Sequence, residues 1–429
     1  MREPMDHSIR IGSFRGMKNL NKSTILNLIR LHGPISRAEL AKLTTLTPPT
    51  VTHIVAELLE ANLVVEKESG PSTGGRRPIL LELNGKGMGG IGLCAGGQRI
   101  RGMLATLDGE ILREEELSVT SGVTAERYLS LLDQVIERLL PKQGDPPLLG
   151  IGVGMHGLVD PIRGISLFAP HLHLVNLPIK AHLEERFGLD VELENDVRAM
   201  ALAEQWFGEG VGSANVIVLH VGSGIGAGLI LEGKRYRGKG FTAGEVGHTV
   251  ILPDGPVCSC GQRGCLEALA SGMAIARRYG EEKLQGRKGG LTPPSPSSSE
   301  EEIERFMATE PTSGADGDRG EELLNAEEVI SLAKEGDPLA RMVVEEAGRY
   351  LGYAIVNLIH VFNPERIILC GSLLQGGKFY LDPMMKAIDE RTLPLPRRNV
   401  EIRLSNLGDK SPLIGAYALI LEKLFLPES

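Results

Sequence analysis

The chain has 429 residues, of which 42% are hydrophobic and only 4% aromatic. This length predicts two or three domains, and the scarcity of aromatic rings argues against a stacking platform for single-stranded nucleic acid. The formal net charge of −9, taken for the whole chain, argues against any nucleic-acid-binding protein. That average conceals an uneven distribution, because residues 1–86 carry a net charge of +4 and the remainder carries −13.

The sequence predicts a cytoplasmic protein without a membrane partner. Its first twenty residues lack the apolar segment of a signal peptide, and five cysteines are too few for a disulfide scaffold. The longest uncharged run, Val211–Leu231, is interrupted by glycines. It therefore favours strand, turn and strand over a membrane helix.

The N-terminal fifth of the chain has the pattern of a winged helix-turn-helix. After an extension over residues 1–20, residues 21–84 predict three short helices and then two strands. Ser36 and Glu39 form a capping box at the second helix, and Thr47 caps the third. Such domains place the second helix of the helix-turn-helix pair, here the third helix, in the major groove of duplex DNA.

The predicted DNA contacts lie on the helix pair and at the wing. Polar side chains on the third helix can reach base edges or phosphates, and arginines can reach the backbone or a minor groove. The candidates are Arg37, Thr47, Thr50, Thr52, His53, Arg76 and Arg77. A domain used only for dimerisation is the alternative, but the positive charge of residues 1–86 favours DNA.

From Gly89 onward the sequence alternates between strands and helices, which is typical of an α/β fold. Strands are expected at residues 148–153, 191–193, 216–221, 226–231 and 366–370. Residues 91–111 and 216–231 share the order apolar strand, glycine-rich turn, apolar strand, which predicts an internally duplicated, two-lobed body. Residues 285–325, rich in Pro, Ser and Glu, are predicted to be a disordered surface insertion.

Four residues have the spacing of a metal site. His248, Cys258, Cys260 and Cys265 form the pattern H-x9-C-x-C-x4-C. Three thiolates and one imidazole suit tetrahedral Zn²⁺ and leave no position open for water, so the pattern indicates a structural zinc. Reduced cysteines without a metal are the alternative.

A further group of polar residues suits the hydroxyl groups of a sugar. Carboxylate, amide and imidazole side chains can donate to and accept from neighbouring hydroxyls. The candidates from the residues alone are Asn195, Asp196, Glu245, His248 and Glu267. Asp196 directly precedes a predicted helix, so the alternative for this residue is a helix cap.

These motifs together resemble the ROK family, named for repressors, open reading frames and sugar kinases. The resemblance rests on HGPISRAELAKLT and STGGRRPILLELN in the winged part, ENDVRAMALAEQWFG and GEVGH at the polar residues, and CSCGQRGCLEALAS at the cysteines. It implies an actin-like (ribonuclease H-like), two-lobed sugar-kinase fold preceded by the winged helix-turn-helix domain. It also implies one structural Zn²⁺, a double-stranded DNA operator, a sugar or sugar phosphate effector, and a homodimer or tetramer.

The expected first lobe covers residues 85–200 and 411–429, and the second covers residues 201–410 with the zinc site. In kinases of the family the aspartate of the Asn-Asp pair is the general base that deprotonates the sugar, a capacity that Asp196 retains. His171 stands where the family usually has Asn, and joins the expected sugar contacts.

Other departures concern phosphate binding. The family motif D-x-G-G-T reads Cys94, Ala95, Gly96, Gly97 and Gln98, so a neutral thiol replaces the carboxylate that would hold Mg²⁺. A second glycine hairpin, with Gly222 and Gly224, is intact. At the sugar pocket, His156 stands where the family usually has Pro, and together with His171 this departure leaves the identity of the sugar open.

We therefore expect a sugar-responsive, DNA-binding transcriptional regulator, a repressor of carbohydrate genes, with a degenerate and inactive kinase body that does not use ATP or Mg²⁺. One alternative is an active ATP-dependent sugar kinase with a DNA-binding arm, favoured by Asp196 and the second hairpin and opposed by Cys94 and Gln98. Another is a body that binds a partner protein instead of a sugar.

Overall fold

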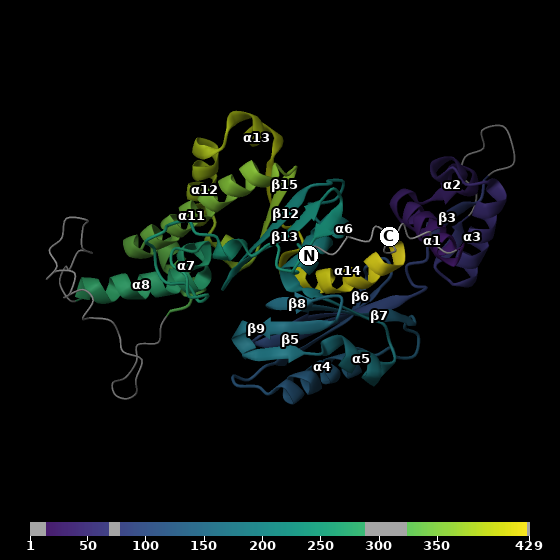
Figure 1. Cartoon of the computed structure of the whole chain (residues 1–429), viewed down its shortest axis with the longest axis horizontal. Coiled ribbons are helices and arrows are strands. Elements are labelled where there is room, and N and C mark those ends of the chain that lie inside the picture. Colours follow the sequence, from purple (N-terminus) through teal and green to yellow (C-terminus); the bar gives the residue numbers. More distant parts are fainter. Residues whose placement is uncertain (1–13, 68–77, 288–323, 427–429) are drawn as a thin grey trace, which may run out of the picture. The chain divides into compact units, whose positions relative to one another are not determined.

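The computed structural model describes residues 14–67, 78–287 and 324–426 (Figure 1). The chain divides into two compact units. The first consists of Met1–Gly212, Arg235–Ala243 and Asp409–Ser429, and the second of Ser213–Lys234 and Gly244–Gly408. The first unit thus contains the winged domain together with part of the α/β body. The expected lobe boundaries stay a prediction.

The winged domain contains three helices and a three-stranded sheet of order β1-β3-β2. Its elements are α1 (Phe14–His32), β1 (Ile35–Ser36), α2 (Arg37–Thr44), α3 (Pro48–Glu60), β2 (Val64–Lys67) and β3 (Leu80–Leu83). Helix α1 begins at Phe14 rather than Asn21, so it takes up part of the expected extension. The short strand β1, which pairs with β3, was not expected.

The predicted caps explain where these helices begin. The Ser36 hydroxyl accepts from the Glu39 N–H while the Glu39 carboxylate accepts from the Ser36 N–H, which confirms the capping box. At α3 the Thr47 hydroxyl accepts from the Thr50 N–H. One apolar stripe of α3 fills the core of the domain and consists of Val51, Ile54, Val55 and Leu58.

The first unit contains a five-stranded sheet of order β11-β7-β4-β5-β6 and a small antiparallel sheet of order β10-β9-β8. The strands are β4 (Gly89–Ala95), β5 (Arg99–Thr106), β6 (Ile111–Ser118), β7 (Leu148–Met155), β8 (Leu158–Asp160), β9 (Ile165–Ala169), β10 (Leu174–Leu177) and β11 (Val191–Asn195). The helices are α4 (Ala125–Leu139), α5 (Ile179–Phe187), α6 (Asp196–Phe207) and α14 (Ser411–Phe425), with short turns η1 (Pro170–Leu172) and η4 (Gly408–Lys410).

Strand β4 shows why helices can cover both faces of this sheet. Ile91 and Leu93 belong to one buried cluster with α4 and α5, and α14 packs on the other side, as Figure 1 shows. Glycine at position 92 is required there, because a Cβ would lie 2.8 Å from the carbonyl oxygen of Leu413 in α14. Because side chains alternate between the two faces of a strand, the branched residues fill the face toward α4 and α5, and the glycine leaves room for α14 on the other face.

The second unit has a five-stranded sheet of order β14-β13-β12-β15-β16. The strands are β12 (Val216–Val221), β13 (Ile225–Leu231), β14 (Lys234–Tyr236), β15 (Arg366–Cys370) and β16 (Glu401–Leu404). The helices are α7 (Leu266–Ala270), α8 (Gly272–Arg287), α10 (Ala326–Glu335), α11 (Pro338–Phe362), α12 (Lys378–Arg391) and α13 (Pro394–Asn399), with turns η2 (Val246–His248) and η3 (Ser372–Gly376).

The two large sheets repeat one topology, which confirms the predicted duplication. In each, three consecutive strands form an antiparallel meander, and two later strands add in parallel beside its first strand. The uncharged run Val211–Leu231 forms β12, a turn and β13, as expected. Among the described residues, no helix is both long and apolar enough to cross a membrane.

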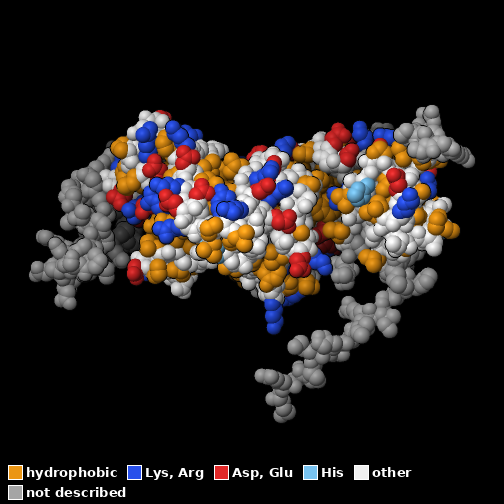
Figure 2. All heavy atoms as spheres, turned by 90° about the horizontal axis from the view of Figure 1, so that it is seen from above, with side chains coloured by type: hydrophobic (Ala, Val, Ile, Leu, Met, Phe, Trp, Pro, Cys, Tyr) orange, Lys and Arg blue, Asp and Glu red, His pale blue; other side chains and the backbone are white. Residues whose placement is uncertain are grey.

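Of the expected insertion, residues 288–323 lie outside the described part of the chain, as do Arg76 and Arg77. The ends of the insertion differ from the expectation, because α8 continues to Arg287 and Asn325 caps α10. On the described face shown in Figure 2, acidic and basic side chains are intermixed. The negative charge of the body is therefore not gathered in a single patch on that face.

Candidate functional site

The exposed face of α3 carries the polar side chains predicted to contact DNA. Thr47, Thr52 and His53 are exposed, whereas Thr50 is half-buried. The hydroxyl of Thr52 donates to the Pro48 carbonyl at 2.9 Å, which leaves its oxygen able to accept. His53 lies 3.2 Å from the Glu57 carboxylate one turn later, with 67% of its side chain exposed. This face can offer hydroxyl and imidazole groups to a groove.

Arg37 opens α2, as expected, but it already has an acidic partner. Its guanidinium donates to the Glu66 carboxylate of β2 at 2.6 Å. A phosphate contact by Arg37 would therefore compete with an ion pair that links the helix pair to the wing.

Two of the predicted sugar residues lie at the junction of β11 and α6. Asn195 caps α6 by accepting from the Arg198 N–H, and its amide donates to the Gly157 carbonyl at 3.1 Å. The cap is thus Asn195 and not Asp196. The Asp196 carboxylate accepts from the Val197 N–H at 2.8 Å, and 19% of its side chain is exposed. Asp196 is held at a helix start, where the helix dipole favours its charge.

The two histidines that depart from the family pattern meet beside Asp196. The rings of His156 and His171 stack with centroids 4.7 Å apart and planes inclined by 18°. His156 Nδ1 lies 3.5 Å from a carboxylate oxygen of Asp196. The structure therefore brings the predicted residues Asp196 and His171 together through His156.

The first phosphate loop, between β4 and β5, keeps its turn but has no carboxylate at its start. Cys94 is half-buried, and burial, reinforced by the charge of Asp196, raises the pKa of its thiol to about 12. Such a thiol stays neutral near pH 7 and is a poor ligand for Mg²⁺. The Tyr128 hydroxyl donates to the Gly96 carbonyl at 3.0 Å, and a Cβ at Gly97 would lie 2.8 Å from the Cβ of His171. The loop is therefore retained as a packing element beside the histidine pair.

A buried ion-pair cluster next to Asp196 was missed by the sequence analysis. The Glu194 carboxylate is fully buried and accepts from Arg198 at 2.8 Å, Arg235 at 2.9 Å and Arg237 at 2.7 Å. Burial by itself raises the pKa of Glu194, but attraction to these arginines outweighs it and holds the pKa at about 2. Arg235 also pairs with Glu422 of α14. The cluster fixes the strand end from which Asn195 and Asp196 project.

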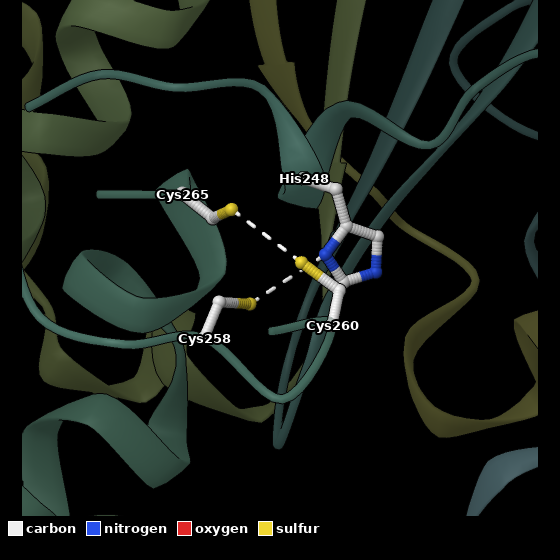
Figure 3. Close-up of side chains that lie close together, drawn as sticks. All are labelled: His248, Cys258, Cys260 and Cys265. Atoms are coloured by element: carbon white, nitrogen blue, oxygen red, sulfur yellow. Dashed lines mark hydrogen bonds between the residues drawn. The ribbon is translucent and has the colours of Figure 1, made fainter. Parts of the chain in front are cut away.

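In the second unit, the predicted metal residues converge (Figure 3). Cys258 Sγ lies 3.6 Å from His248 Nδ1, and Cys260 Sγ lies 3.7 Å from Cys265 Sγ. All four ligand atoms lie within 4.8 Å of one another. Ligands at zinc distances of about 2.3 Å for sulfur and about 2.0 Å for nitrogen have tetrahedral edges of roughly 3.5–3.8 Å. The separations within these two pairs fit that geometry, and the other pairs of ligand atoms lie within 4.8 Å.

The loop around the cluster is shaped for these ligands. Gly261 and Gly264 have φ values of +85° and +70°, so the expected tight turns at both glycines are confirmed. The backbone N–H of Gln262 donates to Cys260 and lowers the pKa of its thiol. In Figure 3 the second ring nitrogen of His248 points away from the sulfurs. His248 can therefore bind a metal and still present a polar atom elsewhere.

Glu267 and Glu245, the other predicted sugar residues of the second unit, differ in their surroundings. The Glu267 carboxylate accepts from the Ile225 N–H at 3.2 Å and from the Ser259 hydroxyl at 3.1 Å, and so links the hairpin of Gly222 and Gly224 to the cysteine loop. Glu245 is exposed and precedes the short turn η2. Glu267 thus has a structural role, whatever else it binds.

Comparison with known proteins places this geometry in a family. Residues 90–423 match the ROK family, and residues 19–65 match a winged helix-turn-helix DNA-binding family. The chain belongs to the ROK family. A xylose repressor from Caldicellulosiruptor bescii is 33% identical over 422 residues, which cover 97% of this chain and all of the repressor.

Solved ROK structures agree with this assignment. A ROK family transcriptional regulator, a homologue of the E. coli MLC protein, is 30% identical with a TM-score of 0.78, and the match covers 95% of this chain and 97% of that one. A ROK glucokinase from Streptomyces griseus, solved with glucose and AMPPNP, is 28% identical with a TM-score of 0.61. Its match covers 98% of the kinase but only 77% of this chain. Like a ROK regulator, this chain therefore has a winged helix-turn-helix domain in front of its ROK body.

Proposed function

We propose that this chain is a transcriptional repressor that binds operator DNA through its winged domain and responds to a sugar or sugar phosphate bound by its ROK body. The observation that carries the proposal is the winged helix-turn-helix domain in front of that body. The two regulators match the chain over at least 95% of its length, whereas the match to the glucokinase covers 77% of it. A two-fold homodimer would require an operator that is roughly palindromic.

The side chains of α3 support the DNA-binding half of the proposal. Thr52 and His53 are exposed on the helix that enters the groove in domains of this kind. Binding is tested with a duplex selected by the protein from a randomised library, at a stated salt concentration because phosphate contacts are salt-dependent. Replacement of His53 by Ala should weaken binding by about 1–3 kcal/mol if it contacts a base. Thr24→Ala, at an exposed site on α1, is the control.

The sugar half rests on Asp196 and the histidine pair of the first unit. Asp196 is a partly exposed carboxylate at a helix start, with His156 beside it and His171 stacked on His156, which suits the recognition of hydroxyl groups. Glu245, His248 and Glu267 of the second unit remain predicted sugar contacts. Isothermal titration with pentoses, hexoses, N-acetylhexosamines and their phosphates tests this half. Absence of binding at millimolar concentration would favour a partner protein instead.

We further propose that the cluster of His248, Cys258, Cys260 and Cys265 holds one Zn²⁺ in a structural role. Two separations support this, because the distances from Cys258 Sγ to His248 Nδ1 and from Cys260 Sγ to Cys265 Sγ both match edges of a zinc tetrahedron. Bound zinc would tie η2 to the loop before α7. No ligand position would be left for catalysis.

An active sugar kinase is the second candidate, and the retained Asp196 favours it. The neutral thiol of Cys94 opposes it, because phosphoryl transfer depends on charge neutralisation by a bound metal. An ADP-release assay over the same sugars decides between the two. We expect no turnover above background. Robust turnover that is lost in Asp196→Asn would overturn the proposal of an inactive body.

A further inference from the structure

The winged domain and the ROK body share one hydrophobic core within the first unit. A single cluster of buried side chains runs from α1 and α3 into α6 and α14. In Figure 1 the C-terminal end of α14 lies beside α1, in agreement with their contacts. Trp206, near the end of α6, and Phe425, at the end of α14, meet there with ring centroids 5.8 Å apart. Both helices of the body therefore end on the winged domain.

One charged residue of α1 lies over both rings. The guanidinium carbon of Arg30 is 4.4 Å from the centroid of Trp206 and 5.3 Å from that of Phe425. Asn27, one turn earlier on α1, accepts from Arg30 Nε at 3.0 Å and fixes the orientation of the guanidinium. Cation–π attraction depends on this placement over the ring face and is stronger where water is excluded.

The other end of α6 lies at the predicted sugar residues. The helix begins at Asp196, and its twelve residues span about 18 Å at 1.5 Å per residue. Residues Val197 to Glu204 are all buried. At Gly415 of α14 a Cβ would lie 2.5 Å from the Ala199 carbonyl, so the two helices pack backbone against backbone. Such close packing makes α6 and α14 move as one body.

We propose that Arg30 is the positioning residue that couples the sugar site to the DNA-binding domain. A shift of α6 caused by sugar at Asp196 moves Trp206 and Phe425, and Arg30 transmits that shift to α1. The part of this inference in which a bound sugar moves α6 rests on the proposed function. A sugar changes operator affinity only if it favours one arrangement of the rings and Arg30 over another, and the coupling is reciprocal.

The contact itself can be tested without DNA or sugar. Trp206 is the only tryptophan of the chain, so intrinsic fluorescence reports on this junction. In Arg30→Gln the emission of Trp206 should shift and its quenching by acrylamide should rise, and Arg30→Lys, which keeps a cation, should restore part of the wild-type signal. Arg186→Gln, which removes an exposed arginine paired with Glu137, is the charge-matched control. Identical spectra for wild type and Arg30→Gln would overturn the inference.

Coupling is then measured as the ratio of operator affinities without and with sugar, using the selected duplex and the sugar panel. A ratio of about 5- to 150-fold is typical of allosteric coupling. In Arg30→Gln it should fall below about twofold while calorimetric sugar affinity in the absence of DNA persists. A wild-type ratio in Arg30→Gln overturns the inference and leaves the proposed function intact. A ratio of one in the wild-type protein for every sugar overturns the proposed function, and with it the sugar input to Arg30.

Discussion

Glu194 is fully buried and supports the strand end beside Asp196, a residue of the proposed sugar site. Its carboxylate pairs with Arg198 of α6 and with Arg235 and Arg237 of the segment that returns to the first unit. A buried charge is tolerated when all its partners are present, and removing one member leaves the others unpaired in a medium of low polarity. The cluster is therefore sensitive to any single substitution.

Replacement of Glu194 by Gln should lower the free energy of unfolding by about 3–5 kcal/mol near pH 7. Because the folded pKa of Glu194 is about 2 and the unfolded pKa is about 4.3, the charge stabilises the protein above the unfolded value. That contribution is lost as pH falls from about 4.3 through about 2. Urea unfolding over this range measures the difference between variant and wild type.

Glu137→Gln, which removes an exposed ion pair with Arg186, is the control and should change stability little. If Glu194→Gln lowers the free energy of unfolding by the same amount at pH 3 and at pH 7, the charge of Glu194 does not have this stabilising role.

The sequence predicted the residues of the candidate sites better than the neighbouring residues that hold them in place. Asp196 and the four predicted metal ligands stand in motifs whose spacing reflects local chemistry, and the structure brings the four metal residues together. Glu194 lies two residues before Asp196, but two of its partners lie 41 and 43 residues away in the sequence, and no sequence motif predicts a contact over that separation. The contact of His156 with Asp196 likewise depends on the pairing of β7 with β11. Long-range ion pairs become visible only once the sheet is known.

Among the elements, α11 and α12 depend on two glycines for their close packing. Gly348 and Gly352 are four residues apart and so lie on one face of α11. A Cβ at Gly352 would lie 2.6 Å from the Met384 carbonyl, and one at Gly348 would meet the carbonyl of Tyr380. The helices must separate to accept any side chain at either position.

Gly352→Ala should therefore destabilise the protein by about 1–3 kcal/mol, as overpacking does, even though Ala favours a helix by about 1 kcal/mol. Thermal unfolding by circular dichroism measures this. Val361→Ala, at a site on the same helix that is 73% exposed, should leave the transition nearly unchanged. An increase in stability for Gly352→Ala would mean that the helix propensity of Ala outweighs the cost of separating α11 from α12, and would contradict this prediction.

The cysteine loop contains little regular structure of its own, so a bound metal should stabilise it. Purified protein should contain about one Zn²⁺ per chain, and Cys258→Ser should reduce this toward zero and lower the unfolding temperature. Elemental analysis gives the stoichiometry. Cys94→Ser, outside the cluster, should keep the metal. A metal-free wild-type protein that is fully folded would contradict a structural zinc.

At the scale of the whole molecule, the net charge of −9 is the sum of a basic winged part and an acidic body. Local charge and capping residues identified the winged domain, and the glycine turns identified the duplication. The sequence did not reveal that Arg235–Ala243 returns to the first unit or that α1 shares a core with α6 and α14. Those features follow from long-range packing, which the local pattern of residues does not encode.

The central claim is that a sugar bound by the body controls a DNA-binding domain. The most direct test is the affinity of the full chain for its selected duplex, at fixed salt, as each sugar is titrated into wild type and Asp196→Asn. We predict that one class of sugar changes the wild-type affinity by about 5- to 150-fold, whereas Asp196→Asn binds the duplex equally well but does not respond. An unchanged affinity for every sugar, or the same response in Asp196→Asn, would contradict the account.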